Sequence, residues 1–163
     1  MRIRQIEADD FAVLSLAMDD WWGGKPVRHL LHRMYFDHFS STSFAAVEGD
    51  EVIGFLVGFR SQSQPEQAYI HLVGVSPQAR GREVGRNLYR HFFEAVGKSG
   101  CREVRAITSP GNAASIAFHR RMGFALLPGD GVEEGVPVMY DYSGPGQHRV
   151  GFQLRLDADA YGA

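Results

Sequence analysis

Apolar residues alternate with polar ones, or recur every three to four positions, over most of the chain, and these two periods predict strands and helices. Residues 2–7 and 149–156 alternate as strands, and residues 43–48 and 51–59 form β-rich runs on either side of Gly49-Asp50. A two-residue turn containing glycine is typical of a β-hairpin. The remaining predicted strands are 68–75, 102–108 and 124–127.

The helical period predicts four helices between these strands. The first begins after the capping residues Asp9-Asp10 and runs to about Asp20, before the breaker Trp21-Trp22-Gly23-Gly24. The second spans about 27–39, and we expect its inner stripe to contain Leu30, Leu31, Met34 and Tyr35. The third presents one apolar face made of Val84, Leu88, Phe92 and Val96. The fourth is capped by Asn112 and ended by Gly123.

The order of elements is therefore βααβββαβαββ, with a long glycine-rich loop expected over residues 128–147. This order predicts a mixed α/β domain with one central sheet of six to seven strands and helices on both faces. We expect a single domain over residues 1–156 and a frayed tail over residues 157–163.

Composition narrows the classes of function. The chain has 163 residues, 44% of them hydrophobic, and a formal net charge of −2, which lacks the basic surplus that a nucleic-acid binder needs. No apolar run approaches the roughly 20 residues of a membrane span, and the first six residues lack the apolar core of a signal peptide. A single cysteine, Cys101, fits a reducing compartment, so we expect a cytoplasmic protein with no membrane partner.

The stretch Arg80-Gly81-Arg82-Glu83-Val84-Gly85-Arg86 combines two glycines and three arginines at the start of the third helix. The first turn of a helix has N–H groups without intrahelical partners, and the helix dipole places partial positive charge there. Glycines let the backbone curl around an anion, and arginines add charge-assisted donors. The stretch indicates a phosphate-binding loop, and the alternative is a glycine turn with solvated arginines. It is neither a Walker loop nor a dinucleotide fingerprint, because it lacks Gly-Lys-Ser/Thr and the early G-x-G-x-x-G.

A second feature lies on the fourth helix, in the stretch from Asn112 to Phe124. Asn112 and His119 are seven residues, or about two turns, apart, so they share one face, with Ser115 between them. A polar stripe on a largely apolar helix is expected to line a groove. His29 and His32 are three residues apart, but the sequence offers no third ligand nearby, so no metal site is predicted.

The two features together resemble the GNAT superfamily of N-acetyltransferases. That family has a phosphate loop of the form R/Q-x-x-G-x-G/A and a later helix of the form N-x-x-S/A-x-x-F-Y-x-x-x-G-F, in this order and one strand apart. The predicted elements also match the GNAT-like fold over nearly the whole chain. There are two departures: Glu83 stands where the family usually has glycine, and His119 stands where it commonly has a tyrosine general acid. A carboxylate at 83 is compatible with a bound diphosphate if it points away or pairs with an arginine.

The resemblance implies an acyl-donor cosubstrate, acetyl-CoA, lying between the strands at 68–75 and 102–108. The pantetheine arm would pair with the backbone of Val73, Gly74 and Val75. Gly74 within a strand independently indicates a bulge or a close backbone approach. The diphosphate would rest on the backbone from Arg80 to Arg86. The implied cofactor-binding residues are Val73, Gly74, Val75, Arg80, Gly81, Arg82, Glu83, Val84, Gly85, Arg86, Asn112, Ser115, Phe118 and His119.

The implied reaction is acetyl transfer to a primary amine of a small molecule or peptide, by direct attack in a ternary complex. His71, on the central strand, is the candidate base, and the alternative is a packed strand residue. A backbone N–H near Val73 would hold the oxyanion, and His119 would return a proton to the thiolate unless it merely contacts the cofactor. Candidate substrate residues are Trp21, Trp22, Tyr35 and Asp141, with Glu133 and Glu134 in the same acidic loop.

Two other functions stay open at this point. A catalytically silent acyl-CoA sensor would keep the groove without the chemistry, and Glu83 and His119 are the residues that favour it. A nucleotide-phosphate binder would use only the loop. Homodimers are common among GNAT proteins, so self-pairing is a further alternative.

Overall fold

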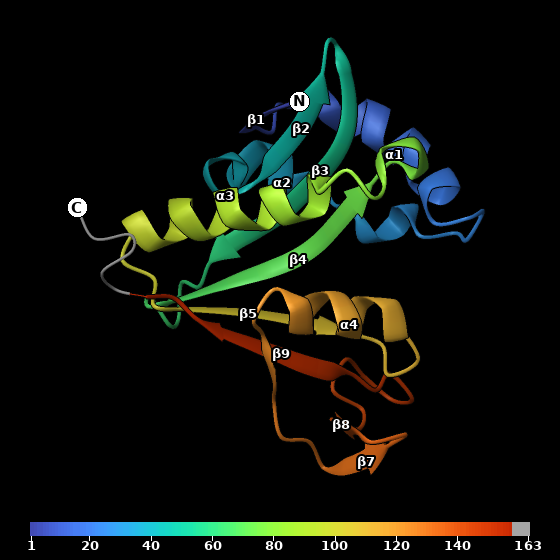
Figure 1. Cartoon of the computed structure of the whole chain (residues 1–163), viewed down its shortest axis with the longest axis vertical. Coiled ribbons are helices and arrows are strands. Elements are labelled where there is room, and N and C mark those ends of the chain that lie inside the picture. The colour runs from blue at the N-terminus through green and yellow to red at the C-terminus, as the bar shows by residue number, and fades with distance from the viewer. Residues whose placement is uncertain (158–163) are drawn as a thin grey trace.

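The computed structural model describes residues 1–157 of the chain, so the tail expected at 157–163 lies, apart from Asp157, outside the described residues. Seven strands form one mixed sheet in the order β1-β2-β3-β4-β5-β9-β6, which confirms the predicted architecture (Figure 1). β4 and β5 are parallel, and the other neighbours in the sheet are antiparallel. The strands are β1 (Arg2–Gln5), β2 (Phe44–Glu48), β3 (Glu51–Arg60), β4 (Gln67–Val75), β5 (Glu103–Thr108), β6 (Ala125–Leu126) and β9 (Val150–Arg155).

Helices cover both faces of this sheet, as predicted. The helices are α1 (Asp10–Trp21), α2 (Met34–His38), α3 (Val84–Lys98) and α4 (Ala113–Arg121), with 3-10 turns η1 (Arg28–Leu30), η2 (Ser40–Thr42) and η3 (Pro77–Ala79). Successive residues of β3 point to opposite faces: Phe55 packs with α1 and α2, whereas Leu56 packs with α3. Within residues 1–157 no helix is long and apolar enough to cross a lipid bilayer.

The second predicted helix, 27–39, is wrong in extent. The chain there forms η1 and the five-residue α2, separated by extended backbone at Leu31 (φ −90°, ψ 108°). Leu31 and Tyr35 of the predicted stripe are buried, but Leu30 and Met34 are 37% and 47% exposed. The helix breaks because contacts distant in sequence hold the backbone: the Asp19 carboxylate accepts from the N–H groups of Val27 and Arg28.

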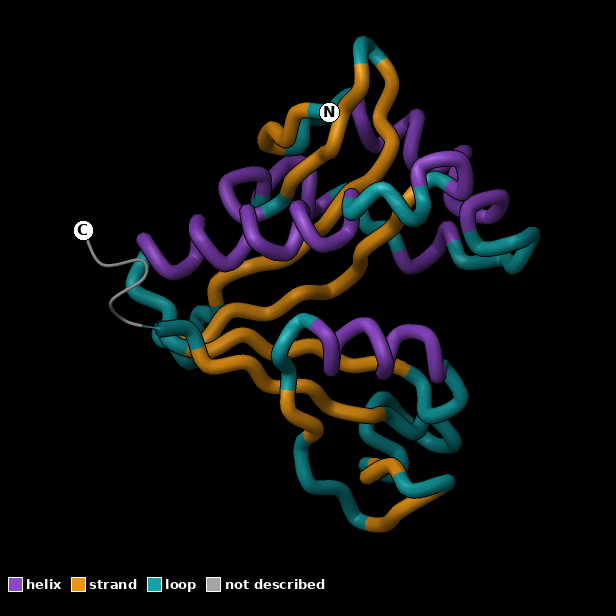
Figure 2. Tube along the Cα trace, in the orientation of Figure 1, coloured by secondary structure: helices purple, strands orange, loops and turns teal. Residues whose placement is uncertain are grey.

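The loop expected over 128–147 also contains a hairpin, formed by β7 (Gly131–Glu133) and β8 (Val136–Val138). Figure 2 shows this short hairpin within the long, mostly irregular connection between β6 and β9. Its turn residues Glu134 and Gly135 both have positive φ, of 49° and 77°. Two left-handed turn residues favour a tight hairpin. The sequence did not predict it, because glutamate is not among the residues typical of this backbone conformation.

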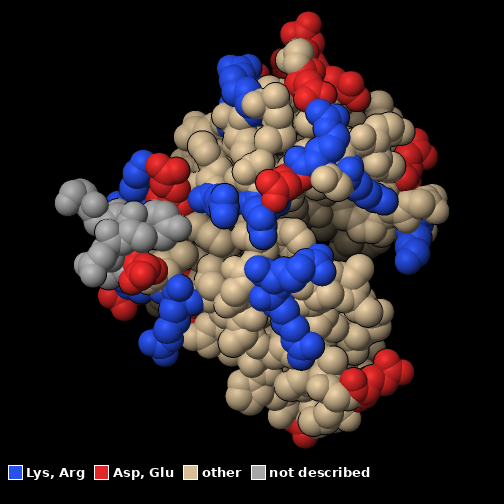
Figure 3. Space-filling view, in the orientation of Figure 1, with Lys and Arg blue, Asp and Glu red and all other residues tan. Residues whose placement is uncertain are grey.

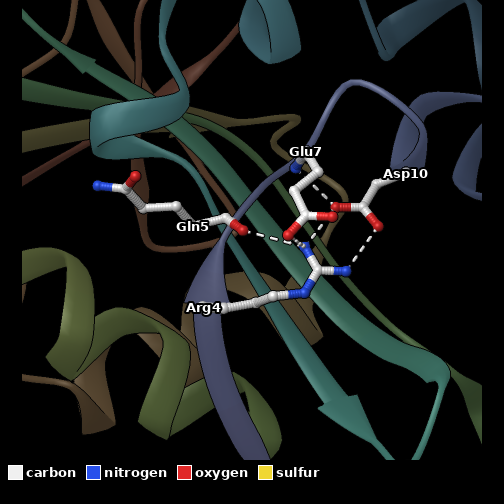
Figure 4. A network of polar contacts seen from close by, with 4 residues as sticks. All are labelled: Arg4, Gln5, Glu7 and Asp10. Carbon is white, nitrogen blue, oxygen red and sulfur yellow. Dashed lines mark hydrogen bonds and ion pairs between the residues drawn. The ribbon is translucent and has the colours of Figure 1, made fainter.

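The start of α1 is fixed to β1 by a partly buried ion pair (Figure 4). Two nitrogens of the Arg4 guanidinium lie 2.7 and 2.8 Å from the two carboxylate oxygens of Asp10. The Glu7 N–H also donates to this carboxylate, at 2.7 Å. Burial by itself would raise the pKa of Asp10, but the hydrogen bonds from Arg4 and Glu7 outweigh it and hold that pKa below its ordinary value.

Candidate active site

A gap opens between β4 and β5 in the middle of the sheet. Their parallel pairing extends only from Gln67 and Glu103 to Tyr69 and Arg105, although the strands continue to Val75 and Thr108. Beyond the paired segment the strands separate, and the N-terminal ends of α3 and α4 lie at the open end (Figure 1). A cavity of about 210 Å³ lies in the gap, lined on the strands by Ile70, His71, Leu72, Val73, Ala106, Ile107 and Thr108.

β4 is irregular where it borders this gap. Val57 faces Leu72 and Gly58 faces Ile70, so His71 is the extra residue of a β-bulge. Gly74, which the sequence marked as a bulge or a close approach, is the close approach. A Cβ atom there would lie 2.5 Å from Phe55 and 2.8 Å from Trp22. The indole of Trp22 therefore lies directly against the backbone at the end of β4.

The predicted phosphate loop has free main-chain donors. Among the described residues, none of the N–H groups of residues 81–86 has a hydrogen-bond acceptor; the first bond of α3 runs from Asn87 N–H to the Glu83 carbonyl, 3.0 Å. Gly81 and Glu83 adopt left-handed backbone, with φ of 75° and 61°. Left-handed residues in a turn are typical of loops that gather successive N–H groups on one side. A hollow of about 650 Å³ is lined by residues of this loop together with residues of α3 and α4. The loop therefore presents unpaired main-chain donors beside a hollow.

The three arginines of the loop are already engaged with protein groups. Arg80 donates to the Trp21 carbonyl, Arg82 reaches Glu48 at 2.6 Å, and Arg86 reaches Glu83 at 2.8 Å. Glu83 therefore pairs with an arginine, which is the arrangement that the sequence required for a carboxylate at this position. Figure 3 shows basic side chains on both rims of a hollow between the two halves of the molecule.

His119 is buried on the inner face of α4, at the cavity between the strands. Its Nε2 lies 2.9 Å from the Tyr89 hydroxyl and its Nδ1 lies 2.8 Å from the Ser115 carbonyl. The imidazole stacks on Phe152, with ring centroids 4.0 Å apart and planes 5° apart. Burial lowers the pKa of His119, so the ring is neutral at neutral pH. Asn112 caps the helix by accepting from Ser115 N–H at 3.1 Å.

His71 borders the same cavity from the other side. Its Nε2 lies 2.9 Å from the Leu30 carbonyl, and its ring stacks on Tyr35 with centroids 4.9 Å apart. Because a carbonyl only accepts, Nε2 carries the hydrogen and Nδ1 keeps a lone pair. Burial lowers the pKa of His71, and the bond to Leu30 opposes this. The side chain is a packed strand residue whose Nδ1 keeps a lone pair.

The candidate substrate residues separate into two groups. Trp21 and Trp22 line a hollow of about 710 Å³ that also includes Lys25, Arg80 and Asn112. Tyr35 reaches the site only through its stacking on His71. Asp141 lines none of these cavities: it has a φ of 51°, accepts from Gly146 N–H and lies 3.6 Å from His148. Glu133 and Glu134 belong to the β7–β8 hairpin and its turn.

Three neighbouring cavities thus share lining residues and bring the predicted loop, the end of β4 and the face of α4 together. Phe118 and Val75 line the loop cavity, and Val73, Asn112, Ser115 and His119 line the cavity in the gap. Sequence reasoning did not identify Tyr89, which also lines the gap. The only signal was a hydroxyl-bearing residue next to Leu88 on the buried face of α3.

Comparison with known proteins agrees with this geometry. The sequence model of the Acetyltransferase (GNAT) family matches residues 2–124. The L-2,4-diaminobutyric acid acetyltransferase of Shouchella clausii is 34% identical over 89 residues, covering 55% of this chain and 50% of that protein. The mycothiol acetyltransferase of Gordonia bronchialis is 28% identical over 126 residues, covering 72% of this chain and 40% of that protein. The chain therefore spans about half the length, or less, of these curated relatives.

Solved structures show the same fold. The diaminobutyrate acetyltransferase EctA from Paenibacillus lautus, determined in complex with L-2,4-diaminobutyric acid and coenzyme A, superimposes with a TM-score of 0.71 at 19% identity. The alignment covers 95% of this chain and 94% of that one. The ribosomal-protein-alanine N-acetyltransferase from Brucella melitensis also has a TM-score of 0.71, at 19% identity, covering 96% and 100%.

Proposed function

Because the chain belongs to the acetyltransferase (GNAT) family, we propose that it transfers an acetyl group from acetyl-CoA to a primary amine. The amine attacks directly in a ternary complex, and it is carried by a small molecule or a peptide. One observation carries the proposal: six consecutive free N–H groups, residues 81–86, lie at the open end of the gap between β4 and β5. Small-amine acceptors in the names of the curated relatives support this substrate class.

Binding of the acyl donor uses main-chain donors. The N–H groups at the start of α3, together with its dipole, hold the diphosphate. Val73, Gly74 and Val75 pair with β3 along one edge, and their other edge has no partner in the sheet, so it can pair with the pantetheine amides. Asn112 uses its side-chain oxygen as a helix cap and keeps its NH₂ group as a donor to the same arm.

The acceptor must lose a proton before or during attack. An amine with a pKa of about 10.4 costs about 4–5 kcal/mol to deprotonate at pH 7. His71 supports this step because Nδ1 keeps a free lone pair beside the cavity. A main-chain N–H near Val73 stabilises the oxyanion, and His119 on the opposite wall belongs to the path that returns a proton to the sulfur.

The proposal extends to the setting of the enzyme. The single cysteine and the slightly negative charge support a cytoplasmic protein without a nucleic-acid partner. The 1–156 segment is proposed to act as one domain. Trp21 and Trp22 are the proposed walls for the acceptor because Trp22 lines both the outer hollow and the cavity in the gap.

Two measurements test the function. Calorimetric titration of coenzyme A into the folded chain should release heat, and acetyl-CoA with a panel of amines, L-2,4-diaminobutyrate included, should release free thiol. Cofactor binding without thiol release from any amine would favour the silent sensor, and displacement by ATP but not coenzyme A would favour a nucleotide-phosphate binder. His119→Ala should lower turnover more than cofactor affinity; unchanged turnover would remove His119 from the mechanism.

A further inference from the structure

Two buried polar side chains from different helices meet at the cavity between β4 and β5. Tyr89 of α3 is 3% exposed and His119 of α4 is 6% exposed, and the Tyr89 hydroxyl lies 2.9 Å from Nε2 of His119. Both residues line the cavity with Val73 and Thr108, at the ends of the separated strands. The pair therefore borders the space in which the proposed acetyl transfer takes place.

The hydrogen-bond pattern fixes the direction of the protons. Nδ1 of His119 lies 2.8 Å from the Ser115 carbonyl and 3.3 Å from the Ser115 hydroxyl; a carbonyl has no hydrogen to give, so the shorter contact places the hydrogen on Nδ1. Nε2 of the neutral ring then has only a lone pair, and the Tyr89 hydroxyl donates to it. Neutral His119 consequently has no proton to give from Nε2, and its Nδ1 proton is held by the helix backbone. The available proton at the cavity is that of Tyr89.

We propose that Tyr89 is a catalytic residue and that its hydroxyl, backed by Nε2 of His119, carries the proton from the acceptor nitrogen to the departing sulfur. This inference rests on the proposed acetyltransferase function. His71 takes the first proton, from the ammonium form, before attack. As the C–N bond forms, the neutral nitrogen gives its next proton to the phenol oxygen while the phenol proton moves to Nε2. As the C–S bond breaks, Nε2 returns that proton to the phenol oxygen while the phenol proton moves to sulfur. In the relay itself one N–H bond is broken, one S–H bond is formed, and both of its side chains end as they began.

Burial disfavours charge on both members of the pair, so the relay passes through an imidazolium only while the proton is in transit. Burial raises the pKa of Tyr89, so a free phenolate is costly there, and the relay never leaves one. The imidazolium formed midway keeps its Nδ1 bond to Ser115 and stacks on the face of Phe152. The other rings around it include those of Phe118 and Phe124, and none of the ion pairs among the described residues includes His119. The imidazolium is therefore less stable than the neutral ring and exists only during the proton transfer.

Tyr89→Phe removes the hydroxyl but keeps the ring, whose edge-on contacts with Phe93, Phe118 and Phe124 hold its position. We expect turnover, measured as thiol release, to fall about 100-fold or more, as for loss of an acid–base group, with the Kd for coenzyme A changed less than about twofold. Tyr69→Phe is the matched control, because it removes the hydroxyl of a partly buried tyrosine on β4 that stacks on Phe59 and lines no part of the gap.

Full turnover in Tyr89→Phe, with an active wild type, would overturn the relay and leave the proposed function intact. Absence of thiol release in the wild type would instead contradict the function itself. A readout independent of activity is the ¹⁵N spectrum of His119 in the uncomplexed wild type. The relay requires hydrogen on Nδ1 and a bare Nε2; a bare Nδ1 would overturn it even if Tyr89→Phe failed to fold.

Discussion

Glu83 is the residue whose replacement tests the anion-binding loop most directly. Glu83 lines the loop cavity where the diphosphate is proposed to bind, so its carboxylate places a negative charge there. The same carboxylate lies 2.8 Å from Arg86 and neutralises the positive charge of that guanidinium. A unit charge at about 4 Å contributes about 1 kcal/mol in a water-like medium. Glu83→Gln should therefore tighten coenzyme A binding about fivefold.

The backbone of Glu83 adds a second, separable effect. Its φ of 61° costs a non-glycine residue about 1–2 kcal/mol, whereas glycine loses about 0.5–1 kcal/mol of chain entropy on folding. The pair with Arg86 is exposed and contributes at most about 1 kcal/mol. Glu83→Gly should thus bind coenzyme A as tightly as Glu83→Gln. Both variants lack the ion pair, so Glu83→Gly should unfold with a free energy equal to that of Glu83→Gln or up to about 1.5 kcal/mol higher.

Calorimetry at low and high salt measures the affinities, and urea unfolding measures the stabilities. The gain should shrink at high salt, because ions screen exposed charges over about 8 Å or less. Glu94→Gln is the control: it makes the same change in net charge at the far end of α3, where Glu94 pairs with Lys98, and should leave affinity unchanged. Weaker or unchanged binding in Glu83→Gln at low salt would refute the placement of the anion at this loop.

Three further predictions concern the folded state. Gly74→Ala should lower the free energy of unfolding by about 1–3 kcal/mol, because the added Cβ would overlap Phe55 and Trp22. Gly111→Ala is the control: open space surrounds Gly111, so the free energy of unfolding should change little. Equal effects of the two substitutions in urea unfolding would contradict the close approach at Gly74. Asp10→Asn should cost about 2–3 kcal/mol near pH 7 by breaking the pair with Arg4. Because the folded pKa of Asp10 lies below the unfolded value, this difference should be complete above about pH 4 and vanish as pH falls through the folded pKa; a difference independent of pH would exclude the charge. Burial lowers the pKa of His119, so the wild type should lose stability relative to His119→Gln as pH falls below about 6.5, and parallel curves would show an exposed imidazole.

The sequence by itself determined the order of the elements outside residues 27–39 and 128–147, a sheet of six to seven strands, the donor-rich loop over residues 80–86 and the shared face of Asn112 and His119. These features are local. Helical and strand periods follow from backbone geometry, and the unpaired N–H groups follow from the start of a helix. Because these patterns report only local structure, the sequence located the β4–β5 gap only through its resemblance to a family. It also predicted Asp141 as a substrate residue, but Asp141 does not line the cavities at the gap.

The tertiary structure decided which distant groups meet. Tyr89 and His119 are 30 residues apart and Leu30 and His71 are 41 apart, yet each pair shares a hydrogen bond. Hydrogen bonds from Val27 and Arg28 to the Asp19 carboxylate likewise break the helix predicted over 27–39. A hydrophobic period shows which face of an element is buried but not what it is buried against, and a histidine tautomer depends on the acceptor that packing brings to each nitrogen. Packing therefore decided the tautomer of His119 on which the proposed proton path rests.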